Sequence, residues 1–261
     1  MQLHVGGEPM YDLQKASMWK RISAALCDFI ALGIVVVGLA LLFSAILGYD
    51  GQAARLEEIS EKYETEYNVD FDIPETDYEK LTDGEKEQYK SAMDAFSKDG
   101  DANYTYNLLV NLTFVIITFS VLIAFILLEF LVPLLFGNGQ TLGKKVFGVA
   151  VMREDSVKLT PVLLFTRAIL GKYTVETMIP VLIILMIYWG MIGFLGTVLL
   201  FGILILQIVL LASSRERRVL HDRLSHTVAV DYASQMIFES AEARLAYIQR
   251  IHAEQVEAEK E

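Results

Sequence analysis

The sequence predicts an all-α, polytopic transmembrane bundle of four helices, with an acidic helical insertion outside the membrane and a C-terminal cytoplasmic helix. Three observations lead to this fold class. Hydrophobic residues make up 54% of the 261 residues and the mean hydropathy is +0.41, which is too apolar for an ordinary soluble domain. Long apolar stretches alternate with charged segments. The charges of those segments are divided unevenly along the chain.

The first two apolar stretches each predict one membrane-spanning helix, over residues 22–48 and 107–136. Each stretch carries one acidic residue, Asp28 in the first and Glu129 in the second. An acid inside a bilayer costs about 2.5–3.5 kcal/mol on insertion scales, so each is expected to have a partner or a function. Arg21 precedes the first stretch, two helical turns from Asp28, and therefore lies on the same helix face.

The third apolar stretch, residues 174–212, is too long for one crossing and is predicted to cross twice. Helices over residues 174–189 and 191–212 would flank a turn at Trp189 and Gly190, since aromatic residues favour the interface and glycine breaks helices. The first of these two helices is short enough to be tilted or re-entrant, and that alternative stays open.

Charge placement orients the predicted helices. Residues 49–106 carry 17 acidic and 6 basic residues, a net charge of −11 that equals the excess of the whole chain. Residues 1–21, 137–173 and 213–230 carry 3, 6 and 4 basic residues. By the positive-inside rule, these three segments lie in the cytoplasm and residues 49–106 lie outside. Both termini are then cytoplasmic, and the protein is expected in a bacterial cytoplasmic membrane.

The segments outside the bilayer are predicted to be helical as well. Within residues 49–106, apolar residues recur at helical spacing on both sides of a turn at Pro74, and Thr82 with Glu85 has the pattern of a capping box. The negative charge of residues 49–106 is typical of a solvated helix face. The alternative is that it forms a funnel that concentrates cations. Residues 232–261 have the rhythm of an amphipathic helix that binds a partner or a second copy, or else form a solvated tail.

Three motifs resemble those of the RDD family of membrane proteins. They are Lys20-Arg-Ile-Ser-Ala-Ala-Leu-Cys-Asp28, Gly139-Gln-Thr-Leu-Gly-Lys-Lys-Val-Phe-Gly148 and His221-Asp-Arg-Leu-Ser-His-Thr227, in the family's order. The resemblance covers residues 17–231 and implies an RDD-type membrane domain over residues 1–231. The arginine and two aspartates that name the family would be Arg21, Asp28 and Asp222. RDD domains usually have three crossings, so the fourth crossing, the acidic insertion and the C-terminal helix are departures.

The resemblance implies two classes of function. Some RDD proteins look like monovalent cation/proton antiporters that exchange Na⁺, Li⁺ or K⁺ for protons, and others look like accessory partners of larger membrane assemblies. For an antiporter, the candidate ion- and proton-binding residues are Asp28 and Glu129, which both lie ~10 Å from the cytoplasmic surface at helical rise. Pro133 lacks an N–H and so frees the Glu129 carbonyl, which would make the site rich in oxygen.

The alternative gives the same residues a structural role. Asp28 would pair with Arg21 or with a neighbouring helix, and Glu129 would be protonated inside the bundle. Arg21, Asp222 and Arg167 are predicted to form a charge network. In the antiporter, Arg21 would be a switchable counter-charge held by Asp222, whereas in the alternative the same polar residues hold an assembly together. The chain would then be a scaffold that contacts the lipid bilayer and binds further copies of itself or other membrane proteins.

The remaining motifs disfavour other functions. No catalytic or cofactor fingerprint is present, so no enzymatic activity is expected. His221 and His226 match no metal-ligand spacing, and a pI of ≈ 4.9 argues against nucleic-acid binding. Lys144 and Lys145 are expected to contact anionic lipid headgroups.

Overall fold

The computed structural model is mostly helical and describes residues 4–5, 8–9, 13–188, 190–213 and 218–258. Trp189 of the predicted turn and the ends of the chain lie outside the described residues. The chain divides into two compact units. We call Met1–Ile34 with Leu122–Glu261 the motif unit, and Val35–Val121 the insertion unit.

The described elements are mainly α-helices, with two π-helical segments labelled η and two short antiparallel sheets. In chain order they are β1 (His4–Val5), β2 (Glu8–Pro9), α1 (Met18–Leu47), α2 (Tyr49–Tyr67), α3 (Glu75–Tyr78), α4 (Asp83–Lys98), α5 (Gly100–Phe125), η1 (Ile126–Leu131), α6 (Val132–Phe136), α7 (Leu142–Val146), β3 (Val149–Arg153), α8 (Pro161–Phe165), η2 (Thr166–Met178), α9 (Ile179–Tyr188), α10 (Gly193–Ser213), α11 (Leu220–Leu224), β4 (Thr227–Asp231) and α12 (Ala241–Ala258).

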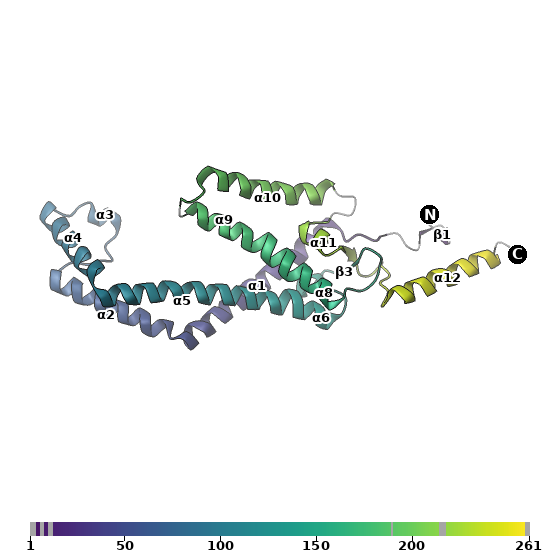
Figure 1. The fold of residues 1–261 in the computed structure, drawn as a ribbon, viewed down its shortest axis with the longest axis horizontal. Helices are drawn as coiled ribbons and strands as arrows, with labels where there is room; N and C mark the ends of the chain where they lie inside the picture. The colour runs from purple at the N-terminus through teal and green to yellow at the C-terminus, as the bar shows by residue number, and fades with distance from the viewer. Residues whose placement is uncertain (1–3, 6–7, 10–12, 189, 214–217, 259–261) are drawn as a thin grey trace. The chain divides into compact units, whose positions relative to one another are not determined.

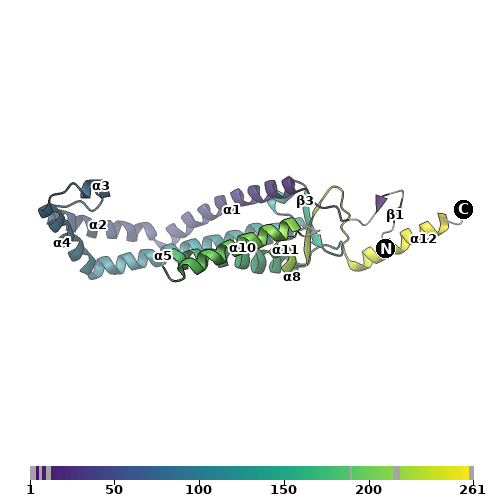
Figure 2. The same cartoon turned by 90° about the horizontal axis from the view of Figure 1, so that it is seen from above.

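The insertion unit contains a helical hairpin with an aromatic core. Its helices α2 and α4 lie side by side (Figures 1 and 2). The ring of Phe96 contacts the rings of Tyr63 and Phe71 at centroid distances of 5.8 and 5.7 Å. The predicted capping box of Thr82 and Glu85 is present at the start of α4, where the side chain of each residue accepts a hydrogen bond from the backbone N–H of the other.

A two-stranded sheet in the motif unit corrects the all-α prediction locally. Strands β3 and β4 run antiparallel, with Val149 opposite Asp231 and Arg153 opposite Thr227. Each strand contains Val-Ala-Val, and β-branched residues favour extended backbone. The sheet is buried, and its core consists of Ala150, Met152, Val228 and Val230.

Three helices within the described residues are long and apolar enough to cross a membrane. They are Met18–Leu47, Gly100–Phe136 and Gly193–Leu210. They match three of the four predicted positions, although the second begins at Gly100 instead of residue 107. The predicted helix over residues 174–189 is not one of these three spans. Its apolar part, α9, has 10 residues.

The helix that contains α9 begins well before residue 174. It starts at Pro161, where the Thr160 side chain caps the first turn and proline occupies a position that needs no N–H. It continues through η2 to Tyr188. Helices α9 and α10 then lie side by side (Figure 1), joined by a turn in which Gly190 adopts a φ of 70°.

The C-terminal helix is shorter than predicted. Helix α12 begins at Ala241, so residues 232–240 are not helical. Phe238 forms an isolated bridge with Val157, and its ring lies 5.4 Å from the ring of Tyr247. The segment before α12 is therefore held against the loop that follows β3.

Candidate functional site

Asp222 lies at the centre of a buried charge network. Its side chain is fully buried, and its carboxylate forms ion pairs with Arg167 and with Arg21, the latter at 3.3 Å between Oδ2 and Nη2. Arg167 also donates a hydrogen bond of 2.7 Å to the Thr227 hydroxyl. The three charged residues come from α11, η2 and α1. The structure therefore brings together the three residues that the sequence predicts as a charge network.

The surroundings keep Asp222 ionised. Burial is the largest single influence and raises the pKa of this carboxyl. The nearby positive charges, that of Arg167 first, and the hydrogen bond from Arg167 together lower it more, so the pKa lies well below its usual range. Removing one partner of such a pair leaves a desolvated charge, which typically costs about 3–5 kcal/mol. The network therefore fixes α1, η2 and α11 relative to one another.

His221 extends the network and is neutral. Its Nε2 lies 3.1 Å from Nη2 of Arg167, and a guanidinium can only donate, so Nε2 is the acceptor. Its Nδ1–H then donates to Glu176 at 2.7 Å. Glu176 also accepts from the backbone N–H of His221 at 2.9 Å. Burial and the nearby Arg167 charge lower the pKa of His221, in agreement with this tautomer.

Asp28 is bound by the loop that carries the second motif. Its carboxylate accepts hydrogen bonds from the Thr141 hydroxyl at 2.5 Å and from the Gly143 N–H at 2.7 Å. A Cβ at residue 143 would lie 2.2 Å from the Ala24 carbonyl oxygen, so only glycine permits this approach of α7 to α1. Gln140 donates to the Val149 carbonyl at 2.9 Å and so ties the loop to β3.

Glu129 has an ion-pair partner that the sequence did not predict. The carboxylate of Glu129, in η1, pairs with Lys172, in η2. The Glu129 side chain is buried. The π-helix η1 ends at Leu131, just before Pro133, whose missing N–H disturbs the regular α-helical bonding.

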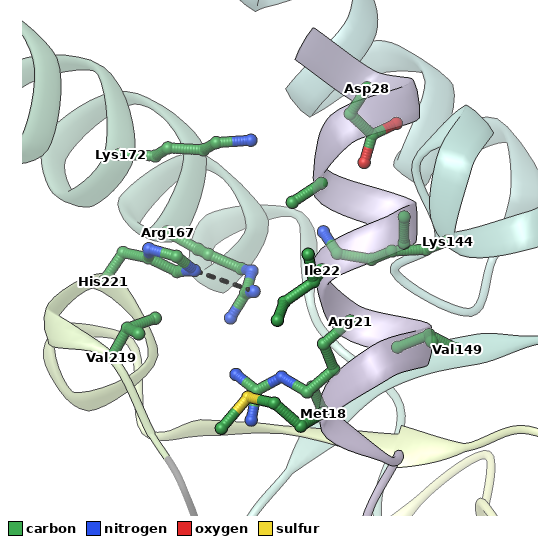
Figure 3. A pocket seen from close by; sticks show the side chains of 13 residues that line it. Met18, Arg21, Ile22, Asp28, Lys144, Val149, Arg167, Lys172, Val219 and His221 are labelled. Atoms are coloured by element: carbon green, nitrogen blue, oxygen red, sulfur yellow. Dashed lines mark hydrogen bonds between the residues drawn. The ribbon is translucent and has the colours of Figure 1, made fainter. Parts of the chain in front are cut away.

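A cavity of about 210 Å³ adjoins the network (Figure 3). Four basic side chains from α1, α7 and η2 line it, and Figure 3 shows their charged ends directed toward the same space. Asp28 is the one carboxylate among its lining residues in the described part of the chain. The basic residues are Arg21, Lys144, Arg167 and Lys172.

The two candidate ion-binding carboxylates line different cavities. Asp28 lines the larger one, whereas Glu129 lines a neighbouring cavity of about 10 Å³. Lys144 and Lys172 line both cavities. Burial, followed by the charge of Arg167, lowers the pKa of Lys144 to about 8. The two acids therefore line different cavities that share two lysines.

The RDD family model matches residues 15–226 of the chain. The matched range includes Arg21, Asp28, Arg167 and Asp222, and with them the charge network described above. The chain matches no curated protein and no solved structure.

Proposed function

The chain belongs to the RDD family of membrane proteins, and we propose that it is a non-transporting accessory protein that binds other proteins in a bacterial cytoplasmic membrane. It performs no catalysis in this proposal. The charge network holds the membrane helices and the cytoplasmic motifs in one arrangement. The segments outside the membrane then present a fixed surface to a partner.

One observation carries the proposal: the carboxylates in and near the charge network already have partners inside the fold. Asp28 accepts two hydrogen bonds, and Glu129, Glu176 and Asp222 each contact a basic side chain. A transported cation would have to displace those partners. Breaking a buried ion pair typically costs about 3–5 kcal/mol, which disfavours a cation at these acids.

We also propose four crossings with both termini in the cytoplasm. Helix α10 has 21 residues, enough to cross once, and it packs against α9 across a short turn. The crossing before α10 needs a helix of similar length. The 10 residues of α9 are too few for it, so this crossing must also include η2. Lys172 and Glu176 then lie inside the membrane, where each polar side chain needs a partner. Lys172 pairs with Glu129, and Glu176 pairs with His221.

Helix α12 provides one test of partner binding. A photo-cross-linking amino acid placed at Leu245, which is 55% exposed, should form a discrete product with a membrane protein in living cells. Glu254 lies on the opposite face of the same helix, nine residues further on, and is the matched control. Equal products at the two positions, or no product at Leu245, would contradict the proposal.

Monovalent cation/proton exchange is the second candidate. The observation in its favour is Lys144, whose pKa of about 8 allows it to release a proton near physiological pH beside Asp28. The purified protein in liposomes distinguishes the two functions. Our proposal predicts no proton movement driven by Na⁺, Li⁺ or K⁺ between about pH 6 and pH 9. Exchange that is lost in Asp28→Asn and Glu129→Gln would establish the antiporter instead.

A further inference from the structure

Lys144 differs from the other basic residues of the cavity. Its side chain lines the cavity, and no hydrogen bond or ion pair joins its Nζ to an acceptor among the described residues. The lowered pKa of Lys144 reflects this setting, because burial and the charge of Arg167 both disfavour its protonated form. An anion in the cavity would stabilise the ammonium and accept its hydrogen bonds.

The rest of the cavity wall is also positive. Arg21, Arg167 and Lys172 line it together with Lys144, and Figure 3 shows the four side chains around the cavity. The carboxylates that pair with them, on Asp222 and Glu129, do not line this cavity in the described part of the chain. Asp28 does line it, but both of its oxygens accept hydrogen bonds from the α7 segment.

The apolar side of the cavity belongs to a lipid-facing helix. Ile22, which is 49% exposed, and Ala25 line the cavity from α1. One turn before Ile22, the Trp19 side chain is 79% exposed at the start of the same helix. Tryptophan is enriched at the membrane–water interface, so this part of α1 lies at the level of the headgroups.

We propose that this cavity binds a phosphate-group anion, supplied by the headgroup of an anionic phospholipid. The phosphate would contact the Lys144 ammonium and the guanidinium groups of Arg21 and Arg167. The glycerol and the first acyl carbons would lie against Ile22 and Ala25. A volume of about 210 Å³ is several times that of one water, about 30 Å³, and accommodates a phosphate group.

The site distinguishes two neighbouring lysines. Lys144 lines the cavity, whereas the exposed Lys145 lies over the ring of Phe136, with Nζ 3.7 Å from the ring centroid. A general attraction to an anionic surface would involve both lysines equally. Of these two lysines, a built site depends only on Lys144. The pair Lys144→Gln and Lys145→Gln therefore separates these explanations.

The test is a binding titration of the purified full-length protein in a neutral detergent, followed by native mass spectrometry. The probes are a short-chain phosphatidylglycerol, a phosphatidylcholine with the same chains, and inorganic phosphate. We expect phosphatidylglycerol to bind ~10-fold more tightly than phosphatidylcholine, and Lys144→Gln to weaken it ~10-fold, the usual effect of losing one charge-assisted hydrogen bond. Lys145→Gln should bind as the wild type does.

A second variant keeps the test decisive if Lys144→Gln does not fold. Ala25→Phe fills the cavity and removes no charge, so it should also weaken binding while the melting temperature stays near that of the wild type. Displacement of the lipid by inorganic phosphate at equal concentration would support the anion site and identify free phosphate as its source. Equal affinity for the two lipids, or equal effects of the two lysine variants, would overturn the proposal.

Discussion

Gly143 allows the second motif to approach α1 closely, because it has no side chain. Its N–H donates to Asp28, and an added Cβ would lie 2.2 Å from a backbone oxygen of Ala24. Gly143→Ala should therefore destabilise the protein by about 1–3 kcal/mol, the range for overpacking. Gly51→Ala, in α2, meets nothing within 4 Å and should be neutral or stabilising. Thermal melting of the detergent-solubilised protein checks both variants, and equal melting temperatures would contradict the prediction.

His221 makes stability depend on pH. Burial lowers its pKa below the ordinary value of 6.5, so the folded state favours the neutral ring. The corresponding stability is fully present above pH 6.5 and is lost as the pH falls toward the lowered value. Asp222, whose pKa is also lowered, adds a further loss below about pH 4. We expect a melting temperature that changes little from pH 7.5 to pH 6.5 and declines toward pH 5.

Two histidine variants check the assignment of this pH effect. His221→Asn should lower the melting temperature at pH 8 and flatten the decline between pH 6.5 and pH 5. His226 is 82% exposed in its side chain and has a φ of 49°, which asparagine tolerates, so His226→Asn should keep the wild-type pH profile. If the decline in melting temperature disappeared in His226→Asn and remained in His221→Asn, the assignment of the pH effect to His221 would be wrong.

The site was only partly predictable at this scale. Arg21, Arg167 and Asp222 were predicted together, and their contacts are present in the structure. The partner of Glu129 was not predicted, because Lys172 comes from a segment distant in sequence and such pairs depend on the tertiary fold.

At the scale of elements, the sheet is the main feature that the sequence analysis missed. Residues 149–153 and 227–231 are buried and short, and so lack the alternation that reveals an exposed strand. The repeated Val-Ala-Val was the available signal. The early start of the helix that begins with α8 was missed for a different reason. The charged residues that follow in η2 resemble those of a loop until their partners are known. Thr160-Pro161 was a start signal there.

Gln140 provides a test of how the second motif is joined to the sheet. Its side-chain amide donates to the buried Val149 carbonyl at 2.9 Å. Gln140→Ala should cost about 1–3 kcal/mol, because it leaves that carbonyl unsatisfied. Gln88 makes a similar bond of 2.6 Å to the Tyr67 carbonyl, but it is exposed, so Gln88→Ala should change stability by about 0.5 kcal/mol or less. Urea titration would show the difference, and equal losses would refute the role of Gln140.

At the scale of the whole molecule, the proposed four crossings determine which segments can be labelled from outside. A cysteine at Ser91, in α4, should react with an impermeant reagent added to intact cells. Cysteines at Ser156 and Ser234 should react only after the membrane is opened. Cys27→Ser provides the background, because it removes the native thiol. Labelling of Ser234 from outside would mean an odd number of crossings after residue 173 and would exclude the four-helix topology.

The central claim is that the membrane-level acids already have partners inside the fold, and for Glu129 that partner is the basic side chain of Lys172. The charge swap Glu129→Lys with Lys172→Glu tests it most directly, with the exposed pair Asp94 and Lys98 as the control. We predict that each single change at residues 129 and 172 lowers the melting temperature and that the double swap recovers at least half of the loss, whereas the control pair shows coupling of about 0.5 kcal/mol or less. Losses at residues 129 and 172 that simply add, with no recovery in the swap, would contradict the account.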